Sequence, residues 1–453
     1  MKKRTIDMTT GSPAKHILTF AVPLVLTNIG QQLYMIADGA IVGRGVGVKA
    51  LAAVGATDWS YWLVLWSVIG LAQGISTFVS RAFGEKNYRE MNKSIATAMV
   101  LCAIIGTVLT VGGVIAAKPV LELLNTPKDI LPGATAYLQI MVAGTLIIMA
   151  YNMAASILRA LGDGKTPLIA MVISAVLNIG LDCLFVFAFD WGIIGAAVAS
   201  LVAQAVSFVY CFVVIARIDC VCLDKEARKI EFKRLKNMLL FGLPISMQYV
   251  VICIGGMILQ SSINLQGSSF IAGYTATNKL HGLLESFAMA FGYSCSTFVA
   301  QNYGAGRFDR VKQGVAKTVK IVTVIALAIT AIALLARWQI LRVFLDVNQE
   351  GGMEALEAGV QYLTIMVSCF LSLYILHVFR NTLEAMGIAA WSMVSGVAEF
   401  LARASMAKLA LYWDSSDVLF TSEPAAWVAA MLSVLLPYLV YRKTRLKDIT
   451  RAG

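Results

Sequence analysis

The sequence predicts an all-α integral membrane protein with twelve transmembrane helices in two pseudo-symmetric six-helix lobes. Three observations lead to this prediction. The 453-residue chain is 58% hydrophobic and only 14% charged, with a mean hydropathy of +0.76, which lies outside the usual range of soluble domains. Apolar stretches of about 20 residues, the length that crosses a bilayer as a helix, recur along the whole chain. The two halves of the chain also resemble each other.

The apolar stretches predict the helices in order. They are expected at residues 17–40, 51–80, 94–117, 134–157, 167–190, 192–216, 239–261, 270–300, 316–338, 358–380, 388–412 and 425–441. The first stretch follows the basic opening "MKKRTIDMTTGSPAK", and no convincing small-residue cleavage site comes after it, so we expect a retained helix rather than a signal peptide. Strand-like alternation at ten-residue spacing is absent, which argues against a transmembrane barrel.

The distribution of Lys and Arg predicts the orientation. If the N-terminus is cytoplasmic, 27 of the 37 Lys and Arg residues fall in inner segments and 6 in outer segments. This bias predicts a multi-pass protein of the cytoplasmic membrane with both termini inside the cell. The net charge of +11 is then a basic rim facing anionic lipid, so membrane lipids and not nucleic acid are the expected partners.

The repeat divides the chain at its most charged stretch. We expect an N-terminal lobe at 1–216, a cytoplasmic linker at 217–236 and a C-terminal lobe at 237–453. "FAVP" (20–23) returns as "FGLP" (241–244), "STFVSRAFG" (76–84) as "STFVAQNYG" (296–304), "YLQIMV" (137–142) as "YLTIMV" (362–367) and "LRALG" (158–162) as "LEAMG" (383–387).

Two lobes of the same orientation that meet at a central cleft could expose that cleft to each side in turn, which is alternating access. Pro23 and Pro244 lie at matching depth in the first helix of each half. Each proline removes one backbone hydrogen bond and permits a bend there. Static packing is the alternative role for both prolines.

Motifs of catalysis and ATP binding are missing. "RALGDGKTP" ends in GKT but has Arg159 where a phosphate-binding loop needs its first glycine. The sequence lacks H-E-x-x-H and G-x-S-x-G and contains only three histidines. Cys220 and Cys222 lack the second pair or the His that a zinc site needs. We therefore do not expect an enzyme, and no cofactor is predicted.

Polar side chains inside the apolar stretches mark a candidate ion site. Asn178 and Asp182 are four residues apart and share one face of the fifth helix, and Asp182 lies roughly 23 Å above the cytoplasmic edge. Asp38 and Ser200 reach similar depths. Oxygen ligands suit a small hard cation, and a buried carboxyl pair also holds a proton readily. Alternatively, Asp38 caps a helix end in water and Asp182 makes a structural contact.

The second half does not copy this site, because its positions matching Asn178 and Asp182 are Arg403 and Ala407. Glu399 and Arg403 could form an intrahelical ion pair, or Glu399 could dock a cationic substrate. The same two alternatives, a structural ion pair or a docking point for a cationic substrate, apply to Glu285, Lys279 and His281. Exposure to solvent is a further alternative for Lys279 and His281.

Trp59, Trp62 and Trp66 form either an interfacial belt or an aromatic wall for flat cations. The candidate residues of a substrate cleft are Gln31, Tyr34, Trp59, Trp62, Glu285, Glu399 and Arg403.

Four segments together resemble the MATE (multidrug and toxic compound extrusion) transporters over nearly the whole chain. They are "PLVLTNIGQQLYMIADGAIVGRGVG", "STFVSRAFGEKNY", "RALGDGKTP" and "STFVAQNYGAGRFDRV". The resemblance implies export of amphipathic, often cationic small molecules driven by inward Na⁺ or H⁺. We expect an antiporter that is a monomer. The related alternative is a flippase for lipid-linked sugars.

The resemblance also implies a coupling-ion site in the N-terminal lobe. In family members of that branch the ligands are an aspartate on the first helix, an Asn and an Asp on the fifth, and a hydroxyl on the sixth. Asp38, Asn178, Asp182 and Ser200 occupy those places, and the first three would be the ligands of Na⁺. Another branch uses acidic residues on the seventh and tenth helices. The stretches 239–261 and 358–380 contain no Asp or Glu, so no such site is expected.

Overall fold

The computed structural model describes residues 5–46, 48–124, 126–349, 351–413 and 415–444. All regular secondary structure in this part of the chain is helical, and the chain divides into two compact units. Unit 1 comprises Val22–Ser246 and the described residues before Thr9, and unit 2 comprises Thr9–Ala21 and the described residues from Met247 onward. The division therefore falls inside two helices, α1 (Pro13–Gly45) and α8 (Phe232–Ile263). The boundaries predicted at residues 216 and 237 stay a prediction.

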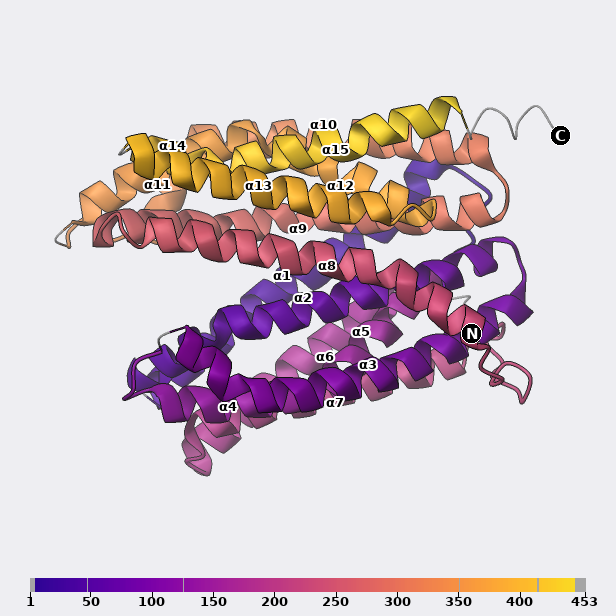
Figure 1. Cartoon of the computed structure of the whole chain (residues 1–453), viewed down its shortest axis with the longest axis horizontal. Coiled ribbons are helices and arrows are strands. Elements are labelled where there is room, and N and C mark those ends of the chain that lie inside the picture. Colours follow the sequence, from indigo (N-terminus) through magenta and orange to yellow (C-terminus); the bar gives the residue numbers. More distant parts are fainter. Residues whose placement is uncertain (1–4, 47, 125, 350, 414, 445–453) are drawn as a thin grey trace. The chain divides into compact units, whose positions relative to one another are not determined.

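The helices of the first half run in the order α1 (Pro13–Gly45), α2 (Val48–Gly84), α3 (Tyr88–Leu123), α4 (Leu131–Ala143), α5 (Thr145–Ala160), α6 (Lys165–Asp182), the π-helix η1 (Cys183–Ala188) and α7 (Gly192–Ala216). Those of the second half are α8 (Phe232–Ile263), α9 (Ser268–Gly304), α10 (Phe308–Arg342), α11 (Gly352–Ser368), α12 (Phe370–Ala385), α13 (Ala390–Trp413), α14 (Ser416–Phe420) and α15 (Ser422–Lys443). Within each unit the long helices run side by side (Figure 1).

The packing inside each unit confirms the internal repeat. In unit 1, α2 packs on α3, α4 and α5, α3 packs on α4 and α5, and α7 packs on α5 and α6. In unit 2, α9 packs on α10, α11 and α12, α10 packs on α11 and α12, and α15 packs on α12 and α13. Each of these pairings in one unit has its counterpart in the other, as two copies of one six-helix topology require.

The predicted helices are all present, but two of them are broken. By length and composition, nine helices of the described chain could cross a membrane, or eleven if each bent pair counts as one span. The bent pairs are α4 with α5, which meet at 44°, and α11 with α12, which meet at 47°. The twelfth predicted span, residues 388–412, corresponds to α13, which carries Glu399, Arg403 and Lys408 and is not among these helices.

The two breaks lie at matching places in the repeat. Gly144 separates α4 from α5, and a Cβ there would lie 2.0 Å from a side-chain carbon of Leu201. Cys369 separates α11 from α12. Hydropathy did not predict either break, because apolar residues continue through both of them.

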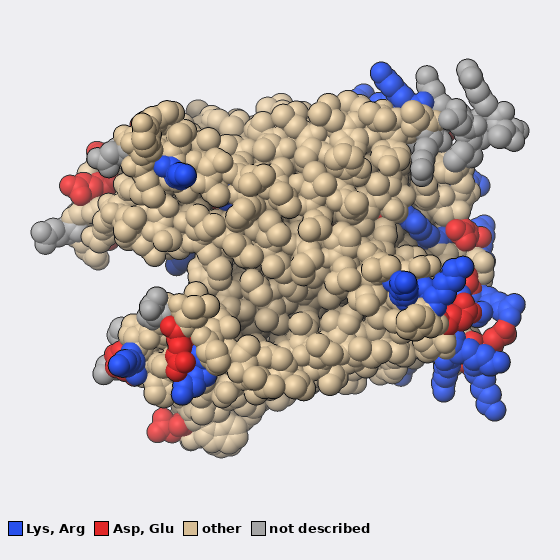
Figure 2. All heavy atoms as spheres, in the orientation of Figure 1, with Lys and Arg blue, Asp and Glu red and all other residues tan. Residues whose placement is uncertain are grey.

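The surface follows the pattern of a membrane protein. On the face drawn in Figure 2, the charged side chains of each unit gather toward the helix ends and leave the middle of the helices uncharged. Large apolar side chains along these middles are exposed, such as Val108 on α3 (64%) and Leu327 on α10 (56%). Such residues contact hydrocarbon in a bilayer, where intact helices leave no backbone group unsatisfied.

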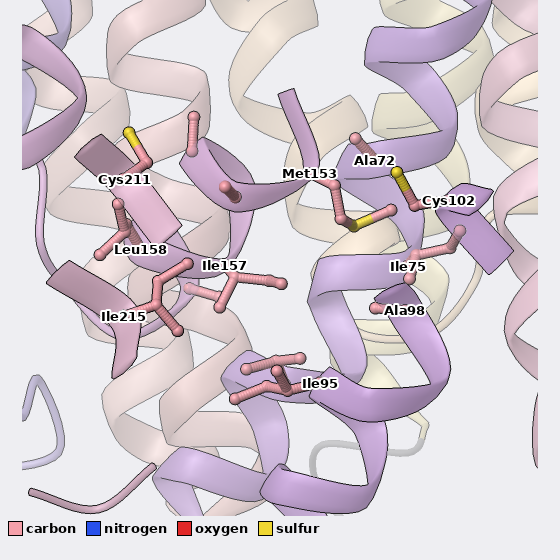
Figure 3. Packing of buried hydrophobic residues seen from close by; sticks show 14 of the residues in the cluster. Ala72, Ile75, Ile95, Ala98, Cys102, Met153, Ile157, Leu158, Cys211 and Ile215 are labelled. Atoms are coloured by element: carbon pink, nitrogen blue, oxygen red, sulfur yellow. The ribbon is translucent and has the colours of Figure 1, made fainter. Parts of the chain in front are cut away.

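The interior of unit 1 contains a large apolar cluster. Side chains of α2, α3, α5 and α7 form it, among them Ile75, Ile95, Met153 and Cys211 (Figure 3). Beside this cluster α2 and α8 approach each other closely, since a Cβ on Gly74 would lie 2.8 Å from the backbone of Gly242. Only glycine permits this spacing.

The linker between the two halves is held against the start of α3. Lys93 pairs with Glu231 at 3.1 Å, Arg234 pairs with Glu90 at 3.1 Å, and Arg89 pairs with Glu226. The hydrogen bond from Lys93 and the nearby Arg234 lower the pKa of Glu231. The Asn92 side chain also bonds to the backbone of Cys220 and Cys222. The charged stretch at 217–236 is therefore an ordered part of unit 1.

Candidate functional site

The candidate ion site lies inside unit 1, where α1 and α6 bring two carboxyl groups together. Asp182 is fully buried, and its side chain is in hydrogen-bonding contact with that of Asp38. The Oδ1 atom of Asp38 is buried and has no hydrogen-bond partner among the described residues. Two ionised carboxylates within hydrogen-bonding contact repel each other unless a proton or a cation lies between them.

A short chain of hydrogen bonds extends this site to α7. Asn178 is fully buried, and its Nδ2 donates to Oγ of Ser200 over 3.2 Å. The hydroxyl group of Tyr34 on α1 lies 3.3 Å from the same Oγ. Asp38, Asn178, Asp182 and Ser200 are therefore close together, although 162 residues of sequence separate Asp38 from Ser200.

Local structure explains the position of Asp182. The residue ends α6, and the next six residues form the π-helix η1. Isolated π segments are rare and often accompany functional sites, because the wider turn changes the direction of side chains. The sequence predicted a regular helix through 167–190, so this feature was missed.

Two further residues of the site escaped the sequence analysis. Tyr61 on α2 and Tyr137 on α4 are within electrostatic range of the Asp38 carboxyl group, as is Tyr34. Tyr137 opens the "YLQIMV" repeat segment, but Tyr362 occupies the matching position in the second half. The repeat therefore gave no reason to assign Tyr137 to the ion site.

The chemistry of the site fits a monovalent cation or a proton. Within the described chain no group of three or more His, Cys, Asp or Glu side chains has the arrangement of a metal site. The oxygens available here come from two carboxyl groups, one amide and hydroxyl groups. Such a mixed oxygen set with at most two negative charges suits Na⁺ or H⁺ better than a divalent transition metal.

Unit 2 contains a buried ion network in place of a second acidic pair. Glu399 is 3% exposed. It pairs with Arg403 at 3.3 Å, as the spacing predicted, and also with Arg380 of α12. Arg403 in turn pairs with Glu423 of α15 at 2.7 Å. Two guanidinium groups neutralise the Glu399 carboxylate, which favours the structural role over substrate docking.

Glu285 lies between two histidines in unit 2. Its carboxylate oxygens are 3.8 Å from His281 on the same helix and 3.5 Å from His377 on α12. The alternative that placed His281 in solvent is wrong, because its side chain is only 15% exposed and its ring lies 5.1 Å from that of Trp427.

The remaining cleft candidates of unit 1 are Gln31, Trp59 and Trp62. Gln31 is exposed, and Trp59 is 38% exposed. Trp62 packs its ring 6.0 Å from that of Trp66. The positions of Trp59 and Trp62 are compatible with both an interfacial belt and an aromatic wall for flat cations.

The two prolines lie inside continuous helices, Pro23 in α1 and Pro244 in α8. Each leaves one carbonyl of the preceding turn without its helical donor. The division between the units falls beside them, at Ala21/Val22 and Ser246/Met247.

Comparison with known proteins gives a consistent result. The MatE family model matches residues 23–184 and again residues 244–408. The "Probable multidrug resistance protein YpnP" of Bacillus subtilis is 30% identical over 308 residues, 68% of this chain and 69% of that protein. The "Probable multidrug resistance protein YoeA" of Bacillus subtilis is 27% identical over 444 residues, 95% and 94% of the two chains.

The fold has the same relatives. A crystal structure of MATE in complex with MaL6 matches over the full length of both chains with a TM-score of 0.88 at 21% identity. Helical topology and sequence together define a multi-span membrane transporter, not an enzyme. The chain belongs to the MatE family. The two matches of one family model, one in each half, also confirm the duplication.

Proposed function

We propose that this chain is a secondary active antiporter of the cytoplasmic membrane. It exports amphipathic, cationic small molecules in exchange for Na⁺ or H⁺ by alternating access, and it works as a monomer with both termini in the cytoplasm. The observation that carries the proposal is the contact between the carboxyl groups of Asp38 and the fully buried Asp182. Buried acids in membrane helices are costly, and they commonly serve ion or proton transfer.

The proposed cycle begins when one cation enters the site from outside. The cation neutralises the carboxyl pair, and the contacts of Asp38 and Tyr34 then reposition α1 about Pro23. This movement loosens the substrate, and return of the ion to the cytoplasm resets the cycle. Cation and substrate need only disfavour each other by about 1–3 kcal/mol.

The relatives named as multidrug resistance proteins support this substrate class over the lipid-linked sugar flippase. A flippase would need unpaired cationic side chains to hold a diphosphate. Arg403 already pairs with Glu399 and Glu423, and Arg380 pairs with Glu399. Neither guanidinium group is therefore available for a diphosphate without breaking a buried pair.

The test is uptake of a fluorescent cation into inverted vesicles, with a pH gradient and a Na⁺ gradient imposed separately. The wild type should accumulate the dye under one of the two gradients. Asp38→Asn and Asp182→Asn should abolish the gradient-driven part, because an amide cannot release a proton and has no negative charge for a cation to neutralise.

The matched control is Asp129→Asn, which removes an exposed carboxylate from the same unit and should leave uptake unchanged. Full uptake by Asp182→Asn would contradict the proposed coupling. Movement of a labelled polyprenyl diphosphate, with no dye uptake under either gradient, would favour the flippase.

A further inference from the structure

A cavity of about 430 Å³ opens in unit 1 among α3, α5, α7 and the linker. Figure 3 shows five of its lining residues, which come from the three helices: Ile95, Cys102, Met153, Ile157 and Ile215. The linker adds Val221, Leu223 and Arg228. None of the lining residues belongs to the Asp38 site, so the cavity is a separate feature of the unit.

The lining is apolar from the interior to the surface. Ile95 and Ile157 are at most 2% exposed and belong to the apolar core, whereas Leu146 and Phe212 are each 38% exposed. Ile104, which follows the lining residue Ala103 on α3, is 50% exposed. The cavity thus extends from the core to a surface that faces hydrocarbon in a membrane, and an alkyl chain could enter it from there.

The one charged residue of the lining is Arg228. Its side chain is exposed and forms no hydrogen bond or ion pair with any residue that the structure describes. Of the linker carboxylates, Glu226 pairs with Arg89 and Glu231 pairs with Lys93, whereas Oδ1 of Asp224 accepts a hydrogen bond from the backbone N–H of Ala227. The cavity therefore combines an apolar lining with one cationic side chain that forms no ion pair among the described residues.

We propose that this cavity binds an anionic phospholipid, with one acyl chain among α3, α5 and α7 and the phosphate group against Arg228. An alkyl chain matches the apolar lining, and a phosphate is the group for which an arginine fork is best suited. Basic segments beside membrane helices attract anionic lipid in the same way. A cationic amphiphile fits poorly, because the lining contains no carboxylate and Arg228 would repel it.

A bound acyl chain would also fill a void beside the core of unit 1. Val221 and Leu223 of the linker would pack on it, so the lipid would stabilise the docked linker together with α3 and α5. A ligand that binds only the folded state raises the apparent stability of the protein.

The experiment measures lipid retention by the purified full-length protein in a neutral detergent. Phosphatidylglycerol and phosphatidylcholine of identical chains compete in equal amounts, and native mass spectrometry counts the bound molecules. Wild type should retain phosphatidylglycerol about fivefold more, the preference expected from one cationic side chain near the membrane surface.

Three variants separate the cavity from general surface charge. Arg228→Gln should remove the preference, and its exposed position lets the protein fold normally. Lys225→Gln, which removes one charge from the same linker outside the cavity, should keep the preference. Ala150→Phe, which places a ring in the cavity, should reduce retention of both lipids.

Four outcomes would overturn the proposal. They are equal retention of both lipids by wild type, an equal loss of preference in Lys225→Gln and Arg228→Gln, displacement of phosphatidylglycerol by equimolar oleate, and displacement by the cationic dye. The first two point to a diffuse basic surface, the third to a fatty-acid site and the fourth to a substrate site. The readout is lipid retention rather than export, so failure of the antiport proposal would leave this one standing.

Discussion

Single residues in this protein divide into those that stabilise the fold and those proposed to bind the coupling ion, and burial alone does not separate the two groups. Glu399, Asp163 and Asp182 are each at most 3% exposed. Their partners differ. Guanidinium groups surround Glu399, backbone and hydroxyl donors surround Asp163, and a second carboxyl group faces Asp182. Stability measurements on variants should therefore separate these roles.

The buried ion network predicts a large loss of stability for Glu399→Gln. The substitution removes the charge that compensates Arg380 and part of Arg403, and breaking a buried ion pair costs about 3–5 kcal/mol of unfolding free energy. Denaturant unfolding of the purified protein should detect it. The double variant Glu399→Leu, Arg380→Met should recover most of the loss, since Arg403 keeps Glu423. A double variant as unstable as Glu399→Gln alone would contradict the assignment.

Asp163 predicts a smaller effect in the turn between α5 and α6. Its Oδ1 accepts hydrogen bonds from the backbone N–H groups of Lys165 and Thr166, each at 3.0 Å, and its Oδ2 accepts from the Thr166 hydroxyl group. Asp163→Ala should lower the unfolding free energy by about 1 kcal/mol, the usual effect of losing a capping side chain. Asp163→Asn keeps an acceptor and should lose less. Thermal melts of the three proteins test the ranking.

At the scale of helices, proline and glycine decide where a helix can bend and how closely two helices approach. Pro23 should allow α1 to change shape during transport. In Pro23→Ala the missing backbone hydrogen bond to Thr19 can form, which favours a straight helix. The expected result is slower gradient-driven export with unchanged helical content, measured by dye transport and circular dichroism. Wild-type export by Pro23→Ala would leave the proline with a packing role only.

Gly273 predicts a packing effect in unit 2. A Cβ at this position would lie 2.3 Å from the carbonyl oxygen of Ala355 and 2.8 Å from the backbone nitrogen of Gly359. Because both are backbone atoms, Gly273→Ala should force α9 away from α11 and lower the melting temperature. Gly112→Ala is the matched control in an open position on α3, where alanine should be neutral or slightly stabilising. Equal melting temperatures for the two variants would contradict the close approach.

At the scale of the whole molecule, antiport requires that the ion and the substrate weaken each other's binding. Raising the concentration of the coupling ion should reduce the affinity of the purified protein for a fluorescent cation by about 5- to 150-fold. Asp182→Asn should abolish this dependence while keeping an affinity for the dye. Binding titrations at several Na⁺ concentrations and pH values test both points. An unchanged ion dependence in the variant would place the coupling site elsewhere.

Much of the fold and part of the site could be predicted from the sequence. Hydropathy indicated every span, and the order of repeated segments indicated the duplication. Both signals can be read from the sequence without knowing which helices are in contact. The spacing of Asn178 and Asp182 put them on one face of α6. Depth along each helix then suggested Asp38 and Ser200 as neighbours. Hydropathy could not predict the breaks at Gly144 and Cys369, since apolar residues run through both.

The sequence by itself determined the class of protein, its twelve spans and its duplication. It also identified the polar residues whose burial in a bilayer costs free energy. Tertiary structure alone decided which of those residues are in contact: Asp38 with Asp182, and Arg403 with Glu423. It also placed Arg228 of the linker in the lining of an apolar cavity. The physical reason is the range of the forces involved. Burial in hydrocarbon selects residue types along each helix independently, whereas pairing and cavities depend on helices far apart in the chain.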